Sequence, residues 1–153
     1  MEAVKKAYKT FQYQTTLVWE GGRRGRTSAA GLPDIEAGSP PDFRGGQAGV
    51  WAPEHLFVAS LNMCLMLTFL SLAERRKLTI TGYDSSAEGL LEHSDGKYRI
   101  TSVTVRPRAA LASEAEVAAA REIMSKVEEN CFISNSITSK INLQPEYFIV
   151  AKS

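Results

Sequence analysis

The sequence predicts one domain, residues 1–153, of the α+β class, in which helices and strands alternate in groups. Its 153 residues suit a single domain with one hydrophobic core. Apolar residues make up 44% of the chain and charged residues 23%, as in ordinary globular proteins. Strand and helix patterns follow one another in the order ββ, long helix, ββ, helix, β, and this order is typical of α+β domains.

The first pair of strands is predicted at residues 11–19 and 26–30. Residues 11–19 are rich in Thr, Val, Tyr and Phe, and the glycine-rich turn Gly21-Gly22-Arg23-Arg24-Gly25 follows them. Residues 33–49 hold three prolines and four glycines without periodicity, so they are predicted to form a loop. Loops of this length tend to be functional or ordered by a partner.

A long helix is predicted from Pro53 to the basic cluster at residues 75–77. Proline is tolerated in a first turn, Glu54 suits the positive end of the helix dipole, and the basic cluster suits its negative end. Residues 56–73 contain no charged side chain. This run is at the short limit for crossing a bilayer, and we predict a buried central helix instead, with no membrane partner.

The second half of the chain predicts a hairpin, a helix and a final strand. The hairpin strands are residues 79–92 and 97–111, joined at Ser94-Asp95-Gly96. A last strand is predicted over residues 141–152, interrupted near Pro145.

The helix between the hairpin and the last strand is alanine-rich and is predicted to end near Asn130. Ser113 and Glu116 have the spacing of a capping box at its start. An apolar stripe of Val117, Met124 and Val127 predicts the face that packs on the sheet.

Charge and composition exclude several function classes. The net charge is +1 with the signs interspersed, which gives no basic surface for nucleic acid. The polar segment Met1–Lys9 lacks the apolar core of a signal peptide, so we expect a cytoplasmic protein. His55 and His93 have no metal-ligand spacing with each other or with the cysteines, so no metal is expected.

The two cysteines are the candidate reactive groups. Cys64 lies in the charge-free helix, and Cys131 follows the second helix. In a reducing compartment such thiols are free or redox-active rather than structural. Cys64 is therefore either inert packing or a nucleophile. A buried nucleophilic thiol needs a fixed cation, and a unit charge at 4 Å contributes about 4 kcal/mol at an effective dielectric of about 20.

The cation has to come from outside the helix, because Cys64 is far from the helix N-terminus. The candidate arginines are Arg23, Arg24 and Arg26 of the first turn and Arg44 of the loop. Glu54 precedes Cys64 by ten residues, or about 15 Å along a helix. It can act only by orienting an arginine, or from a second subunit whose helix runs antiparallel. We therefore predict a homodimer with the site at its interface.

Several motifs together resemble one known family. Pro53-Glu54-His55-Leu56-Phe57-Val58-Ala59 followed by Cys64 is similar to the Pro-Glu-x-Leu-Phe-x-Ala…Cys signature of the OsmC/Ohr superfamily, the osmotically inducible and organic hydroperoxide resistance proteins. Gly45–Gly49 resembles its glycine-rich approach, and Gly21-Gly22-Arg23 falls at its Gly-Gly-Arg turn. The second cysteine is also in place, and the resemblance covers roughly residues 10 to 150.

The resemblance implies a thiol-dependent peroxidase. Cys64 would attack an alkyl or lipid hydroperoxide, release the alcohol and become a sulfenic acid. Arg23, oriented by Glu54, would hold the thiolate and polarise the peroxide. Cys131 would then form a disulfide with Cys64, and an external dithiol reductant would reopen it without any bound cofactor.

The family fold implied by the resemblance is an intertwined α+β homodimer, in which a long buried central helix and a second helix pack on an antiparallel sheet. The residues expected to bind the apolar part of the substrate are Phe57, Leu61, Met63 and Leu65.

Two departures from the family pattern indicate an OsmC-like branch and leave alternatives open. Cys131-Phe132-Ile133-Ser134 keeps the family's serine but lacks its proline, and either Arg23 or Arg24 can face the thiol. The alternative function is a non-catalytic member that binds an apolar molecule or senses oxidants through its cysteines.

Overall fold

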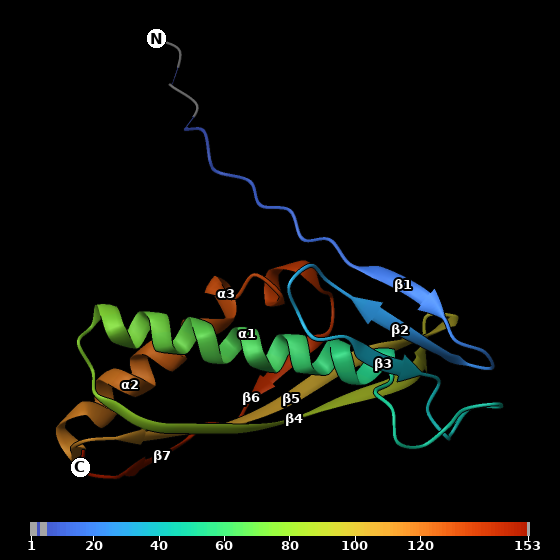
Figure 1. Ribbon diagram of the computed structural model, residues 1–153. Helices are drawn as coiled ribbons and strands as arrows, with labels where there is room; N and C mark the ends of the chain where they lie inside the picture. Colours follow the sequence, from blue (N-terminus) through green and yellow to red (C-terminus); the bar gives the residue numbers. More distant parts are fainter. Residues whose placement is uncertain (1–2, 4–5, 153) are drawn as a thin grey trace. The chain divides into compact units, whose positions relative to one another are not determined.

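The computed structural model describes residues 3 and 6–152 and separates into two compact units, residues 1–53 and 54–153. Short 3₁₀ turns are labelled η. Figure 1 shows the elements in chain order: β1 (Thr16–Trp19), β2 (Arg24–Ser28), β3 (Ile35–Gly38), α1 (Pro53–Arg75), β4 (Ile80–Ser94), β5 (Lys97–Leu111), η1 (Glu114–Glu116), α2 (Val117–Met124), α3 (Val127–Asn130), η2 (Ser134–Ser136), β6 (Lys140–Leu143) and β7 (Glu146–Ile149).

The first unit holds a three-stranded antiparallel sheet in the order β1-β2-β3. Gly21 and Gly22 turn the chain between β1 and β2 with φ of 99° and 54°, a left-handed conformation that glycine adopts without strain. Two predictions were inaccurate here. The first strand starts only at Thr16, and the predicted loop 33–49 contains β3, a short edge strand hidden among prolines and glycines.

The sheet of the second unit is built on a long hairpin. Strands β4 and β5 have 15 residues each and pair antiparallel, as the sequence predicted. β5 also pairs in parallel with β6 along its middle and with β7 at its C-terminal end. The sheet is therefore mixed rather than purely antiparallel. Pro145 separates β6 from β7 because it cannot donate to the ladder, in agreement with the predicted interruption.

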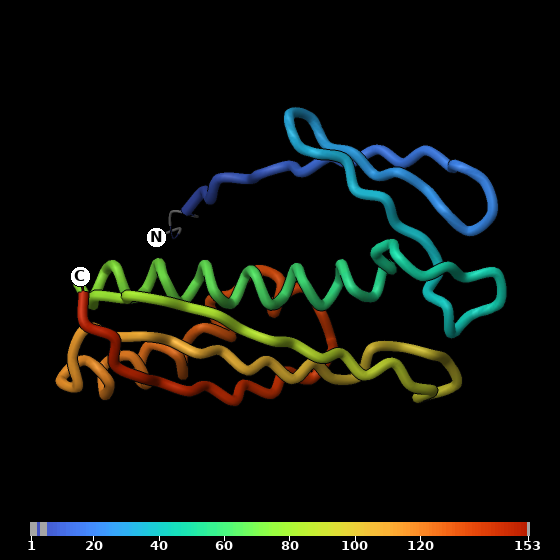
Figure 2. Tube along the Cα trace, turned by 60° about the horizontal axis from the view of Figure 1, so that its bottom comes forward, coloured from blue at the N-terminus to red at the C-terminus, as the bar shows by residue number. Residues whose placement is uncertain are grey.

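Helix α1 lies along one face of this sheet, as Figure 2 shows. Four α1 side chains spaced by four residues are buried: Leu61, Leu65, Phe69 and Ala73. They share one core with alternate residues of β5, namely Val103, Val105, Ala109 and Leu111.

The sequence predicted that α1 is buried on all faces. In the single chain only one face is buried, and the opposite face is exposed. Met63 and Leu67 are each 55% exposed. By length and composition alone, α1 is also apolar enough to cross a membrane, with 22% of its most apolar window buried. Its inner face nevertheless belongs to the core of the second unit.

The alanine-rich segment after β5 is broken into η1, α2 and α3. The predicted capping box is wrong, because the Ser113 side chain makes no capping hydrogen bond. Glu116 instead accepts a hydrogen bond from the Thr79 backbone N–H at 2.9 Å, which ties this segment to the start of β4. Met124 and Val127 of the predicted stripe are buried in the core.

The close approach of α1 to β4 at Gly89 gives a stability prediction. A Cβ at Gly89 would lie 2.6 Å from Cγ2 of Val58, whose branched side chain has few rotamers. We expect Gly89→Ala to lower the free energy of unfolding by about 1–3 kcal/mol, measured by urea denaturation.

The matched control for Gly89 is Gly82 on the same strand. A Cβ there would lie 3.4 Å from the Ala110 Cβ, an acceptable contact, so Gly82→Ala should change stability by less than about 1 kcal/mol. Val58→Ala should partly relieve the cost of Gly89→Ala in the double variant. Strict additivity of the two changes would contradict the proposed clash.

Candidate redox site

The structure brings the two cysteines together in the second unit. Cys64 lies on α1 and is partly exposed, whereas Cys131 is the C-cap residue of α3 and is fully buried. Both thiols are free, and Cys64 packs against the cluster that contains Cys131. Burial, and then a hydrogen bond with the Cys64 side chain, raise the pKa of the Cys131 thiol. Cys131 is therefore expected to be protonated at neutral pH.

Ser134 adds two polar groups beside the buried sulfur. Its backbone N–H donates a hydrogen bond to Sγ of Cys131 at 3.4 Å. Its hydroxyl is buried and has no hydrogen-bond partner within the described residues, and Ser134 lowers the pKa of Cys131 against the larger effect of burial. The sequence places this serine three residues after Cys131 but does not indicate its contact with the sulfur.

A cleft of about 330 Å³ lies beside Cys64. Its lining residues come from one face of α1 and from the ends of the turn that holds Cys131: Cys64, Leu67, Thr68, Ser71, Leu72, Arg75, Asn130 and Phe132. The α1 members follow Cys64 at intervals of three and four residues, so they share its helix face. The cleft therefore combines apolar side chains with hydroxyls and one guanidinium.

The four residues that the sequence predicted to contact the substrate do not line this cleft. Leu61 and Leu65 are 0% and 1% exposed and form part of the core, so in this chain they cannot line an open site. They point toward the sheet because their spacing of four places them on the inner face with Phe69. Phe57 packs partly buried against the same core, and Met63 is exposed.

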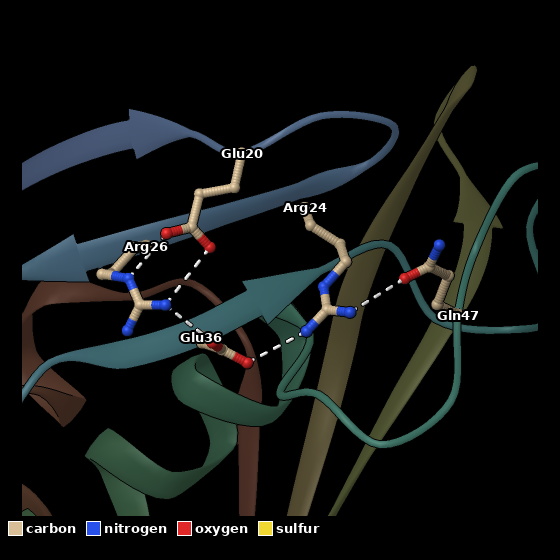
Figure 3. Close-up of polar contacts among 5 residues, drawn as sticks. All are labelled: Glu20, Arg24, Arg26, Glu36 and Gln47. Carbon is tan, nitrogen blue, oxygen red and sulfur yellow. Dashed lines mark hydrogen bonds and ion pairs between the residues drawn. The ribbon is translucent and has the colours of Figure 1, made fainter.

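The arginines of the first unit divide into two kinds, and Figure 3 shows the first kind. Arg24 pairs with Glu36 at 2.9 Å and donates a hydrogen bond to Gln47 at 3.3 Å. Arg26 pairs with Glu20 at 2.6 Å and with Glu36 at 2.7 Å. Both guanidinium groups are thus already neutralised by carboxylates of their own unit.

Arg23 is of the second kind. It lies in the turn before β2, is exposed, and has no hydrogen-bond or ion-pair partner for its side chain among residues 3 and 6–152. Gly45 of the following loop lies against it, since a Cβ there would be 3.3 Å from Cγ and 3.7 Å from Nε of Arg23. Of the two arginines left open by the sequence, Arg23 is the one with an uncommitted guanidinium.

Glu54 lies in the first turn of α1, as predicted. Its Oε2 is buried and has no hydrogen-bond partner in the described part of the chain. Because Cys64 is ten residues further along the same helix, about 15 Å, the two side chains do not meet within α1. A buried carboxylate oxygen without a partner is costly and marks a position that a cation can satisfy.

Metal ligation finds no support in the side chains. Within the described residues there is no group of three or more His, Cys, Asp or Glu side chains that could hold a metal ion.

Comparison with known proteins places this arrangement in a family. The family model described as OsmC-like protein matches residues 46–146, and the chain belongs to that family. The uncharacterised protein YmaD of Bacillus subtilis is 26% identical over 133 residues, which are 84% of this chain and 87% of YmaD. The resemblance inferred from the motifs around Cys64 is confirmed.

Solved structures confirm the α+β fold. An OsmC-like protein of unknown function from Vibrio cholerae has a TM-score of 0.82 at 25% identity, covering 89% of this chain and 99% of that one. The organic hydroperoxide resistance protein OhrB of Bacillus subtilis has a TM-score of 0.64 at 21% identity, covering 90% and 98%. A similar protein from Elizabethkingia anophelis reaches 0.74 at 17% identity, covering 94% and 100%.

Proposed function

We propose that this protein is a thiol-dependent peroxidase that reduces organic hydroperoxides with Cys64 and Cys131. The observation that carries the proposal is a partly exposed thiol, Cys64, which lines a cleft and packs against the buried cluster that contains the second thiol, Cys131. Membership of a family whose fold is shared by proteins named for organic hydroperoxide resistance supports it.

The proposed reaction uses the two sulfurs in sequence. The Cys64 thiolate attacks the outer oxygen of the hydroperoxide, the O–O bond breaks, and the alcohol leaves after taking a proton. The Cys64 sulfenic acid is then attacked by Cys131, which loses its proton as water departs and the disulfide forms. An external dithiol reduces the disulfide and is itself oxidised to a cyclic disulfide, so no bound cofactor takes part.

For the cation beside the Cys64 thiolate we propose Arg23, with Glu54 as the carboxylate that orients it. Within the described residues, the Arg23 guanidinium has no partner and Glu54 has a buried oxygen without one, so each has the group that the other lacks. An arginine can bond a carboxylate and a sulfur at once and stays charged at every physiological pH.

We further propose a cytoplasmic homodimer. Met63 and Leu67 expose large apolar side chains on the outer face of α1, and a second copy of this helix would bury them. Light scattering that shows only a monomer at micromolar concentration would contradict the dimer.

A steady-state assay with cumene hydroperoxide and dithiothreitol tests the peroxidase. We expect many turnovers per chain, since a reopened disulfide regenerates the Cys64 thiolate. The measurement is the loss of hydroperoxide with time, at a constant excess of the dithiol. Oxidation that stops after one equivalent of hydroperoxide would instead support an oxidant sensor. No reaction at all would contradict the peroxidase and support the alternative of a ligand-binding protein.

A further inference from the structure

We propose that Ser134 makes Cys131 the leaving group when the disulfide is reduced, so that the incoming dithiol attacks Cys64. This inference rests on the proposed function, because it concerns the reopening of the Cys64–Cys131 disulfide. Two independent features of the site lead to it, namely the access to each sulfur and the polar groups around each sulfur.

Access favours attack on Cys64. Thiol–disulfide exchange needs a thiolate to reach one of the two sulfurs. Cys64 is partly exposed and lines the cleft of about 330 Å³, whereas Cys131 is 0% exposed beneath α1. Phe132, which is 82% exposed, lies at the cleft beside the buried cysteine. An incoming thiol therefore meets the Cys64 sulfur first.

Burial disfavours a thiolate on Cys131, and the polar groups of Ser134 offset part of this cost when Cys131 departs. The sulfur that leaves becomes a thiolate, and exchange is faster when that thiolate is more stable. The Ser134 N–H already donates to Sγ of Cys131 at 3.4 Å, and the buried Ser134 hydroxyl has no hydrogen-bond partner among the described residues, so it is available as a second donor. A developing negative charge on this sulfur would be solvated by both donors, which water cannot do at a buried position.

One thiolate of the dithiol forms a bond to the Cys64 sulfur, the Cys64–Cys131 bond breaks, and its electron pair stays on Cys131 as a thiolate held by Ser134. The second thiol of the reductant then loses its proton and attacks the reductant sulfur bound to Cys64. Cys64 leaves as a thiolate, the reductant becomes a cyclic disulfide, and Cys131 takes up a proton.

The test compares Ser134→Ala with Ser136→Ala, a matched change in the same turn. The Ser136 hydroxyl donates to the Phe132 carbonyl at 2.7 Å, away from the sulfurs. The disulfide is formed with diamide rather than peroxide, and its reduction by dithiothreitol is followed by stopped flow. We expect reduction of Ser134→Ala to be about 3- to 10-fold slower, because one donor to the leaving thiolate is lost while the N–H remains. Ser136→Ala should reduce at the wild-type rate, and Ser134→Thr, which keeps the hydroxyl, should reduce faster than Ser134→Ala.

A second readout follows the position of attack, which a merely structural role of Ser134 would not change. Oxidised protein is mixed with glutathione, quenched in acid and mapped by mass spectrometry. In the wild type the glutathione should be found on Cys64. Glutathione on Cys131, or equal reduction rates in all variants, would overturn the role of Ser134 alone. If diamide cannot join the two cysteines, both this inference and the proposed disulfide mechanism are wrong.

Discussion

Cys64→Ser should abolish hydroperoxide turnover, with a loss of at least about 1000-fold in the cumene hydroperoxide assay. A serine hydroxyl is not ionised at neutral pH and cannot form a sulfenic acid, so the first step has no nucleophile. The substitution exchanges groups of similar size at a partly exposed position, so the fold should be kept. Circular dichroism melting of the variant checks this, and unchanged turnover would show that Cys64 is not the nucleophile.

Cys131→Ser is the paired control for the second step. It should still consume one equivalent of hydroperoxide at close to the wild-type rate, since Cys64 is intact. Its sulfenic acid then has no thiol to condense with, so it should be trapped by dimedone or be oxidised further. If Cys131→Ser cycles normally with dithiothreitol, the disulfide is not part of the reaction and the reductant acts on the sulfenic acid directly.

The elements predicted most accurately are those whose signals are local. The bounds of α1 follow from Pro53 at its start and the basic residues at its end, and the β4–β5 hairpin follows from a turn dipeptide between two apolar strands. The strand β3 was missed because four residues between glycines and prolines carry too little pattern. The parallel pairing of β5 with β6 and β7 depends on contacts between distant segments, which periodicity does not contain.

The candidate site was predictable only in part, for a similar reason. The motif around Glu54 and Cys64 is local, whereas the meeting of Cys64 with Cys131 depends on the tertiary fold. The cleft on α1 could have been found by counting three and four residues from Cys64, which gives Leu67 and Thr68. Leu61 and Leu65, which the sequence predicted instead, lie on the buried face of the same helix.

Arg23→Ala should slow the oxidation of Cys64 by cumene hydroperoxide about 10- to 100-fold, if Arg23 is the cation beside the thiolate. This is the effect of losing one hydrogen bond to a charged group, about 1.5–3 kcal/mol. Stopped-flow oxidation of the reduced protein by cumene hydroperoxide measures this effect.

Arg24→Ala is the neighbouring control and should change the oxidation rate by less than about threefold. The Arg24 guanidinium is already held by Glu36 and Gln47, and such partly exposed pairs contribute little to stability. Arg23→Lys separates charge from geometry, since an ammonium keeps the charge but lacks the planar fork that can bond a carboxylate and a sulfur together. We expect the oxidation rate of Arg23→Lys to lie between those of the wild type and Arg23→Ala. If Arg24→Ala loses much activity and Arg23→Ala loses none, the proposal names the wrong arginine. The Arg24–Glu36 pair would then have to open during catalysis.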